Sequence, residues 1–473
     1  MPKSATSVRK RRTIPDGTNM RHGTAQLTAR LLATMQSDFA SNPTHKIIQN
    51  AVTQVTVKSI AASRDIVTTS NHSFSITLDD WKTTHQEASG RCWMFAGLNF
   101  LRAGAIKKMN IKEFEFSQNF ILFWDQLEKA NYFLEAVIET ADRDVDDRTV
   151  AFLLNRPTDD AGQWSMLMNI IHKYGLVPKA AMPETQSSSH THVMCTILIS
   201  KLREGAKTLR DLHGKKADLR KLRAAKNDIL KVIHRILSIH LGTPPATFDW
   251  QWTDRKKKFH RDAHMTPPAF AEKYVTVPLD EYVCLMHDPR KTSPARRMFT
   301  VQYLGNVVEG QIVSYLNVDI ALMKKIALRT LQSGEPVWFG CDVAKQLDEK
   351  RGVWDADLHD FEAVYDTTFN LDKAGRLDYG ETRMTHAMVF TGVDVVRGKP
   401  RRWRVENSWG DTCGQKGFYL MNDSWFDEHM FEMTVRRKYL PARFQAALKT
   451  KPIVLPPWDP MGSLAESGAI RRL

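Results

Sequence analysis

One cysteine in this sequence stands where a thiol can act as a nucleophile. Cys92 follows Ser89-Gly90-Arg91, and after it apolar residues recur at helical spacing, namely Phe95, Leu98, Leu101 and Ala105. The pattern predicts that Cys92 lies in the first turn of a helix, behind a Ser-Gly pair that can cap it. The positive end of the helix dipole then favours the thiolate, which is the nucleophilic form. A cysteine taken alone is more often a buried residue that opens a core helix, so the interpretation depends on its companions.

Three further residues complete a recognisable set. Gln86 lies upstream of Cys92, where its side-chain amide can turn towards the same point. His386 stands near the start of an apolar run that is typical of a β-strand, and Asn407 opens the stretch Asn407-Ser408-Trp409-Gly410. Each residue alone is a weak signal, because a lone histidine is more often structural. A glutamine, a cysteine, a histidine and an asparagine in this order resemble the papain-like cysteine peptidases.

The resemblance implies a role for each of these residues. His386 is expected to deprotonate Cys92 and later to protonate the leaving amine. Asn407 is expected to hold the imidazole in one tautomer and orientation, and Trp409 to shield that hydrogen bond from water. The side chain of Gln86 and the backbone N–H of Cys92 are expected to bind the oxyanion.

Further motifs narrow the resemblance to the bleomycin hydrolase branch of this clan, which consists of cytosolic aminopeptidases. The matching stretches are Asp160 to Trp164, Lys173 to Lys179, Asn306 to Val308, Val337 to Val343, Gly380 to Met388 and Pro456 to Ala465. The likeness is good from about residue 68 to 183 and from about 278 to 465. It implies an α+β fold of the papain-like type, with a helical left lobe, a β-rich right lobe and a helical hook insertion.

The chain divides, on this interpretation, into five segments. They are a disordered basic tail (1–17), an N-terminal segment and helical left lobe with the nucleophile (18–185), a basic helical insertion (186–270), a β-rich right lobe with His386 and Asn407 (271–455) and a C-terminal tail that enters the cleft (456–473). An amphipathic helix is expected from about Thr24 to Ala40, and a strand from Asn71 to Leu78. The family's insertion grips neighbouring subunits, so a homohexamer is expected.

Composition is consistent with an intracellular enzyme. The chain has 473 residues and only five scattered cysteines, with no C-x-x-C pair, which argues against a disulfide framework and for a reducing compartment. No run approaches the roughly 20 apolar residues of a membrane span, and the basic N-terminus lacks the apolar core of a secretory signal. A cytoplasmic location, no membrane partner, no cofactor and no metal are therefore expected; His190 and His192 lack further ligands.

The formal net charge of +14 indicates either a polyanionic partner or a solvated, charged surface. The segment from Lys201 to Arg235 holds 12 lysines and arginines against four acids. Nucleic-acid contact is considered there, at Lys215, Lys216, Arg220 and Lys221, and a solvated helix face is the alternative. The competing function is therefore a nucleic-acid-binding hexameric assembly whose peptidase activity is secondary or lost.

The expected activity is that of a cysteine-type aminopeptidase acting on peptide amides, with bleomycin-like amides as further candidate substrates. By the resemblance, Leu464 and Ala465 position the substrate's N-terminus, because the terminal carboxylate of the tail pairs with an α-ammonium. This chain departs from the pattern by carrying eight residues after Ala465. We expect Cys92 to trim them; an exposed and innocuous tail is the alternative. A secreted endopeptidase is disfavoured, because no signal is present.

Overall fold

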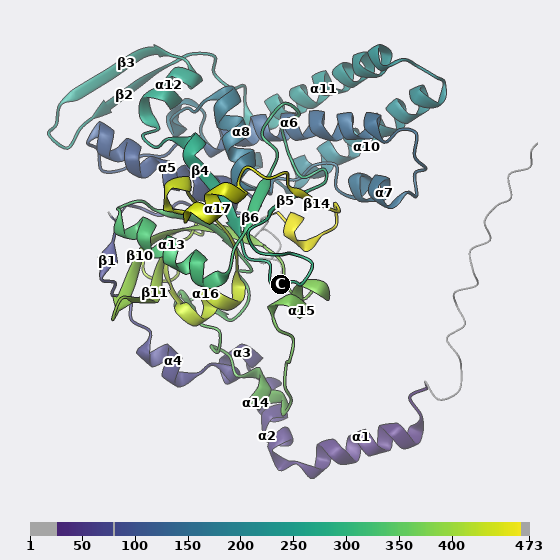
Figure 1. The fold of residues 1–473 in the computed structure, drawn as a ribbon, viewed down its shortest axis with the longest axis vertical. Coiled ribbons are helices and arrows are strands. Elements are labelled where there is room, and N and C mark those ends of the chain that lie inside the picture. Colours follow the sequence, from purple (N-terminus) through teal and green to yellow (C-terminus); the bar gives the residue numbers. More distant parts are fainter. Residues whose placement is uncertain (1–25, 79–80, 465–473) are drawn as a thin grey trace, which may run out of the picture. The chain divides into compact units, whose positions relative to one another are not determined.

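The computed structural model describes residues 26–78 and 81–464, in two compact units (Figure 1). The smaller unit combines the chain up to Ala62 with the segment His359–Thr368. Its helices are α1 (Ala29–Ser41), α2 (Pro43–Val52), α3 (Val57–Ala61) and α14 (Phe361–Tyr365). The helix expected from about Thr24 begins later, because the Thr28 hydroxyl accepts a hydrogen bond from the Leu31 amide and so caps α1 at that point. The tail at 1–17 lies outside the described residues.

The larger unit contains a lobe of packed helices, one of which begins at Cys92. These helices are α5 (Cys92–Met109), α6 (Gln118–Glu139), α7 (Arg148–Asn155), α8 (Trp164–Tyr174), α9 (Gln186–Ser189), α10 (His192–Gly214), α11 (Leu219–Leu241) and α12 (Pro267–Tyr274). Ser117 caps α6 by accepting from the amide of Phe120, and Asp218 caps α11 in the same way. Ile233 and Leu237 of α11 are buried in the core that α5, α6 and α8 share. The basic segment is therefore packed into this lobe through its apolar stripe.

The second lobe is built on one sheet, which among the described residues has twelve strands. Its path is β14-β5-β6-β4-β13-β7-β10-β11-β12-β9-β8, and β1 pairs with β10. The strands are β1 (Ile76–Thr77), β4 (Tyr282–Met286), β5 (Met298–Val301), β6 (Ser314–Asn317), β7 (Val337–Cys341), β8 (Leu347–Asp348), β9 (Val353–Trp354), β10 (His386–Val396), β11 (Lys399–Glu406), β12 (Phe418–Asn422), β13 (Met430–Arg436) and β14 (Ile453–Leu455). A second core lies within this lobe, between the sheet and its helices.

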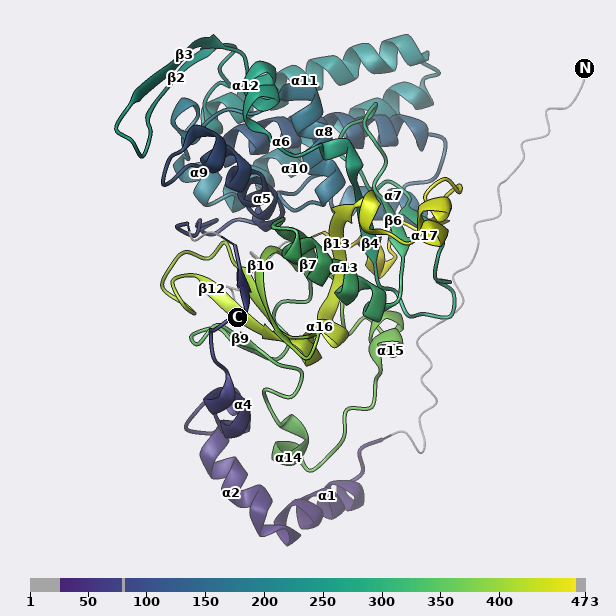
Figure 2. The same cartoon turned by 60° about the vertical axis from the view of Figure 1, so that its left-hand side comes forward.

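Short elements complete the larger unit. They are α4 (Arg64–Thr69), α13 (Ile320–Gln332), α15 (Lys373–Asp378), α16 (Asp423–His429), α17 (Ala442–Ala447) and the 3₁₀ turns η1 (Lys179–Ala181), η2 (Leu279–Glu281), η3 (Arg437–Tyr439) and η4 (Pro460–Gly462). A separate hairpin, β2 (Phe248–Thr253) with β3 (Phe259–Met265), projects beside the helical lobe (Figure 2).

The strand expected from Asn71 to Leu78 is shorter than predicted. Only Ile76 and Thr77 pair with the sheet, opposite Val393 and Gly392. A Cβ at Gly392 would lie 2.6 Å from the carbonyl oxygen of Ile76, so the glycine is what lets the two backbones approach.

The expected α+β class with a helical lobe and a β-rich lobe is confirmed. Helix α5 packs against β10, and the indole of Trp338 on β7 donates to the carbonyl of Trp93 at 3.1 Å. The first turn of α5 is therefore pressed against the centre of the sheet, where β7 and β10 are neighbours. This contact sets the position of Cys92 relative to His386.

Candidate active site

Cys92 is the first residue of α5 and its side chain is buried. The expectation that Ser89 caps this helix is wrong. Arg91 occupies the cap position without a side-chain cap bond, and the Ser89 hydroxyl donates to the carbonyl of Gln86 at 2.6 Å and accepts from Arg91 Nε at 3.0 Å. Ser89 therefore shapes the loop before the helix, while the helix dipole still acts on the thiol.

The loop before Cys92 is held by two carboxylates that the sequence did not single out. Arg91 is fully buried and makes a two-pronged contact with Glu184, at 3.0 and 2.8 Å. Burial raises the pKa of Glu184, but the Arg91 guanidinium outweighs it and holds the pKa below its ordinary value. Asp160 accepts from the Gly90 amide at 2.6 Å through its side chain and from the Trp93 indole at 2.8 Å through its carbonyl. The backbone on both sides of Cys92 is thus fixed.

His386 and Asn407 are in direct contact. His386 Nε2 lies 2.9 Å from Asn407 Oδ1, and both residues are fully buried. The antiparallel pairing of β10 and β11 explains the meeting, because it brings the start of one strand beside the end of the other. The amide of Ser408 also donates to Asn407 Oδ1, at 2.8 Å, which identifies that atom as the oxygen. An amide oxygen only accepts, so the imidazole carries a proton on Nε2.

Trp409 and Gln86 lie around this pair. The rings of Trp409 and His386 are 4.9 Å apart at 31°, and Trp409 is 5% exposed, so the indole covers the imidazole. The Ser408 hydroxyl donates to Gln86 Oε1 at 2.7 Å, and Gln86 Nε2 donates to the carbonyl of Ser89 at 2.5 Å. The amide nitrogen of Gln86 is therefore turned towards the loop that carries Cys92. Ser408 was missed as a site residue, although it lies inside the Asn-Ser-Trp-Gly stretch.

Cys341 is a neighbour of both Cys92 and His386. It lies on β7 directly opposite His386 on β10. Burial raises the pKa of the Cys341 thiol well above its ordinary value, and the charge of Asp342 and, to a smaller extent, that of Cys92 add to the effect. Cys92 and His386 therefore both border the end of β7. The raised pKa keeps the Cys341 thiol protonated, which fits an inert core position.

The segment before His386 is anchored by another residue that the sequence did not reveal. The carboxylate of Asp342 accepts from the hydroxyl of Thr382 at 2.8 Å and from that of Thr385 at 3.3 Å. Asp342 is 5% exposed and follows Cys341 on the chain. Burial raises its pKa above the ordinary value despite these hydrogen bonds. The entry into β10 is thereby tied to the end of β7.

The described end of the C-terminal tail lies beside the nucleophile's helix. Gln163 Nε2 donates to the carbonyl of Ser463 at 2.8 Å, and Leu464 packs on the core of the helical lobe. Gln163 follows Gly162, at which a Cβ would come within 2.5 Å of the Trp93 ring. The tail thus reaches the loop that packs on the residue after Cys92. Ala465 and the expected trimming lie outside the described residues.

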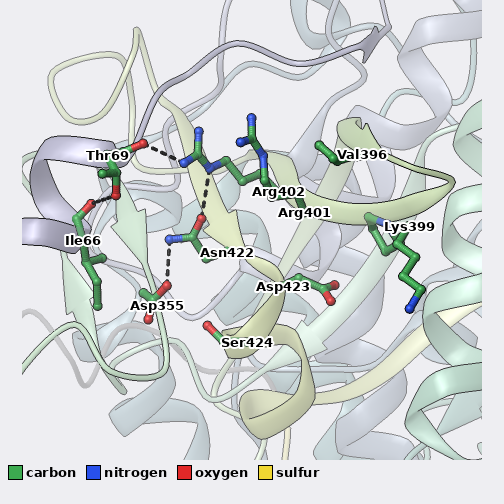
Figure 3. A pocket seen from close by; sticks show the side chains of 11 residues that line it. Ile66, Thr69, Asp355, Val396, Lys399, Arg401, Arg402, Asn422, Asp423 and Ser424 are labelled. Atoms are coloured by element: carbon green, nitrogen blue, oxygen red, sulfur yellow. Dashed lines mark hydrogen bonds between the residues drawn. The ribbon is translucent and has the colours of Figure 1, made fainter.

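An open hollow of about 450 Å³ lies elsewhere, at the far end of the β10–β11 hairpin (Figure 3). Figure 3 shows Arg402 within it, donating to the carbonyl of Thr69 and to Asn422. Val396 lines the hollow ten residues along β10 from His386, which corresponds to about 33 Å of strand. This hollow is therefore not the cleft that serves Cys92.

The four basic residues proposed for nucleic-acid contact gather at the α10–α11 turn. Lys215, Lys216, Arg220 and Lys221 are all exposed. Most other cations of the segment have a carboxylate partner, as in the pairs Lys201–Glu204, Lys207–Asp211, Lys231–Asp228 and Lys226–Glu135. Within the described part of the chain, no such ion pair is formed by the four residues of the turn. Among the described residues they form an exposed cluster of cations that lack a carboxylate partner, whereas Arg203 and Arg210, which also lack one, donate to backbone carbonyls.

Comparisons with known proteins agree with this geometry. The model of the Peptidase C1-like family matches residues 26–462. Aminopeptidase C of Streptococcus thermophilus is 42% identical over 430 residues, covering 91% of this chain and 97% of that protein. Bleomycin hydrolase of Gallus gallus is 41% identical over 436 residues, covering 90% and 96%. The crystal structure of PepW from Lactobacillus rhamnosis HN001 has a TM-score of 0.92 and 45% identity, covering 94% of this chain and all of that one.

These matches confirm the resemblance on which the sequence interpretation rested. They extend through the segments that carry Cys92, His386 and Asn407, and through nearly the whole of each relative. The chain therefore belongs to the Peptidase C1-like family and is a cysteine peptidase of the papain-like fold.

Proposed function

We propose that this protein is a cysteine aminopeptidase that hydrolyses peptide amides at the free N-terminus of a substrate, with Cys92 as its nucleophile. The observation that carries the proposal is the buried 2.9 Å contact between His386 Nε2 and Asn407 Oδ1, at the sheet end against which the first turn of α5 packs. The relatives named Aminopeptidase C and bleomycin hydrolase support the same activity. Bleomycin-like amides are therefore included among the candidate substrates.

The proposed reaction begins with proton transfer inside the site. Because Nε2 of His386 is committed to Asn407, its Nδ1 takes the proton of the Cys92 thiol. The thiolate attacks the carbonyl carbon of the scissile amide, and the carbonyl oxygen becomes an oxyanion. The imidazolium then gives its proton to the leaving amine, the C–N bond breaks and a thioester forms. Water, deprotonated by the imidazole, attacks the thioester, which releases the acid and restores the thiol.

The oxyanion is assigned to two donors on the nucleophile's side of the site. One is the backbone N–H of Cys92 at the start of α5, where helix amides point outwards. The other is the amide nitrogen of Gln86, whose orientation is set by the bond from Ser408 to its oxygen. Removal of one such donor in related chemistry lowers kcat by about 10²–10³.

The tail is proposed to restrict cleavage to the N-terminal end of a substrate. Its contact with Gln163 supports a position at one end of the cleft, where residues 464–465 would face the substrate's α-ammonium. A carboxylate there favours a free N-terminus through a charge-assisted hydrogen bond. In this proposal Cys92 first removes the eight residues after Ala465, which exposes the new terminal carboxylate.

The test is turnover of two substrates that differ only in their N-terminus. Alanyl p-nitroanilide should be hydrolysed and its N-acetyl form should not. Cys92→Ala should abolish turnover, while the control Cys413→Ala, which changes a partly exposed cysteine, should leave it intact. Turnover by Cys92→Ala, or a preference for the blocked substrate, would overturn the proposal.

We also propose self-association as a homohexamer in the cytoplasm. Support comes from α1, which buries none of its residues and exposes Leu31, Leu32, Met35 and Phe39 by 40% or more. An apolar face of this kind favours contact with a second copy. All five cysteines are unbridged, which suits a reducing compartment. In the described ranges no helix is long and apolar enough to cross a membrane. Light scattering that shows only monomer at micromolar concentration would contradict the assembly.

A second function, nucleic-acid binding, is proposed for the α10–α11 turn. The exposed and uncompensated charges of Lys215, Lys216, Arg220 and Lys221 support it. A cluster of this kind attracts phosphate backbones without regard to sequence. The turn belongs to helices that pack through their apolar side on α6, so its cations can be changed without disturbing the core.

A further inference from the structure

The C-terminal segment crosses from the sheet lobe to the helical lobe along a fixed course. It starts as β14, which pairs in parallel with β5. It then forms the turn η4, in which Met461 is buried and a Cβ on Gly462 would lie 2.9 Å from Val301. Its last described residues lie against Gln163, the N-cap residue of α8. The backbone of this segment is thus placed at both of its ends.

Between these ends the tail is held by a buried arginine. The guanidinium of Arg290 contacts Asp459 twice, with Nη2 to Oδ1 at 2.9 Å and Nη1 to Oδ2 at 3.2 Å. The same guanidinium contacts Asp288, with Nη2 to Oδ2 at 2.7 Å and Nε to Oδ1 at 3.0 Å. The side chains of Arg290 and Asp459 are 9% exposed and that of Asp288 is fully buried. One cation therefore bridges two carboxylates inside the protein.

The loop that presents Arg290 is rigidly attached to the sheet. The side-chain nitrogen of Asn317, at the end of β6, donates to the carbonyls of Asp288 at 2.9 Å and Ser293 at 2.6 Å. The Ser293 hydroxyl donates to Asp288 Oδ2 at 2.6 Å. Asp459 in turn accepts from the amide of Met461 at 2.9 Å, which forms the η4 turn. A chain of short contacts thus runs from the sheet through Arg290 to the residues just before Ser463, which contacts Gln163.

Charge explains why the arginine governs the tail. Burial lowers the pKa of Arg290, but Asp288 and Asp459 more than reverse this and raise it above its ordinary value. Without the guanidinium, two carboxylates would face each other in a site with little water. Because Asp288 is held by Asn317 and Ser293, relief would come by movement of Asp459 and the segment that follows it.

We propose that Arg290 is a positioning residue for substrate selection, because it holds the segment from Asp459 to Leu464 against the end of the cleft. The inference rests on the proposed aminopeptidase function. It adds the residue on which the preference for a free N-terminus depends. With the arginine in place, the tail blocks the cleft beyond the substrate's N-terminus. Without it, the tail moves, and longer or N-blocked substrates gain access to Cys92.

The experiment compares Arg290→Met with the wild type in the full-length enzyme. The ratio of kcat/KM for alanyl p-nitroanilide to that for its N-acetyl form should fall at least tenfold. Most of the change should be a gain on the blocked substrate, together with a raised KM for the free amine. A loss of folding alone would lower both rates by the same factor and leave the ratio unchanged. Amide hydrogen exchange should accelerate in residues 456–464 and remain unchanged in residues 386–409.

Two further variants make the result decisive. Asp459→Asn keeps the Asp288–Arg290 pair and should shift the ratio in the same direction by a smaller factor; it decides the matter if Arg290→Met does not fold. Arg351→Met, which removes an arginine paired with Asp348 on the surface, is the matched control and should leave the ratio unchanged. An unchanged ratio with accelerated exchange in the tail, or unchanged exchange, would overturn the inference. Absence of any Cys92-dependent turnover in the wild type would instead overturn the proposed function. The hydrogen-exchange comparison would still test whether Arg290 holds the tail in place.

Discussion

The hydroxyl of Ser408 donates a hydrogen bond to Oε1 of Gln86 at 2.7 Å, and so joins the two sides of the active site. Gln86 comes from the loop before α5, and Ser408 follows Asn407 at the end of β11. The amide of the same serine donates to Asn407 Oδ1 at 2.8 Å. One residue therefore orients both the proposed oxyanion donor and the partner of His386.

Replacement of Ser408 should impair catalysis through Gln86. Ser408→Ala removes the hydroxyl that donates to the oxygen of that amide, while the backbone bond to Asn407 remains. For Ser408→Ala we expect kcat to fall by about tenfold to a hundredfold, with KM little changed. For Gln86→Ala we expect kcat to fall by about 10²–10³. Steady-state kinetics on alanyl p-nitroanilide measures both. If the double variant loses the full product of the two single effects, the residues act independently and the coupling is wrong.

Asn407 should matter as a hydrogen-bond acceptor. Asn407→Ala removes the oxygen that contacts His386 Nε2 and the Ser408 amide, so the imidazole loses its tautomer and its orientation. We expect kcat to fall on the order of 10², within the range that proton-transfer catalysis supplies. Asn407→Asp retains an acceptor at the same place and should lose less. Equal activity of Asn407→Ala and the wild type would remove Asn407 from the mechanism.

Glu432 should make a contribution to the free energy of unfolding that decreases as pH rises towards 8. This carboxyl is 2% exposed; burial raises its pKa to about 8 and outweighs the opposing effect of a hydrogen bond with Cys284. The folded protein therefore keeps a proton that the unfolded chain releases above its ordinary pKa of 4.5. The stabilising contribution is full below pH 4.5 and is lost as pH rises to about 8.

Glu432→Gln should remove this dependence. Between pH 5 and pH 8 the wild type should lose about 4 kcal/mol of unfolding free energy relative to the variant, from about 1.4 kcal/mol per pH unit. Urea denaturation at pH 5, 6.5 and 8 measures the difference. Glu349→Gln, at an exposed glutamate, serves as the control and should follow the wild type. Parallel pH profiles for the wild type and Glu432→Gln would mean that Glu432 is ionised in the folded protein.

The nucleic-acid binding proposed for the α10–α11 turn should depend steeply on salt. Neutralising about four phosphates of a single strand predicts a slope near −3 in a plot of log affinity against log salt. Reversing the charges of Lys215, Lys216, Arg220 and Lys221 should abolish the binding and leave peptidase turnover unchanged. Lys207→Glu with Lys231→Glu, at cations already paired with aspartates, is the control. Fluorescence anisotropy with a labelled oligonucleotide that shows no salt dependence would contradict the proposal.

The sequence predicted the α+β fold with its two lobes, and it proposed a catalytic set because those residues are of unusual types in a fixed order. His386 and Asn407 could be paired in advance, since two adjacent antiparallel strands bring the start of one beside the end of the other. The cap at Ser89 was predicted wrongly, because its hydroxyl is used by Gln86 and Arg91. Hydroxyl side chains have several local partners, and their choice depends on the tertiary fold.

Contacts between residues far apart in the chain could not be predicted from the sequence, for a different reason. Arg290 and Asp459 are separated by 169 positions, and neither lies in a motif that marks it as buried. The Arg91–Glu184 pair and the hydrogen bonds that Asp342 accepts are of the same kind. Charged residues are usually exposed, so a single sequence gives no reason to pair them inside the protein.

The most direct measurement of the central claim is the mass of the protein after treatment with a thiol-directed epoxide. The wild type should gain the mass of one inhibitor, and peptide mapping should place it on Cys92. Cys92→Ala should gain none, while Cys413→Ala should be labelled as the wild type is. The same spectra report the tail: only the species with an intact Cys92 should lose the residues after Ala465. Labelling of Cys92→Ala, or labelling of the wild type at another cysteine, would contradict the assignment of Cys92 as the nucleophile.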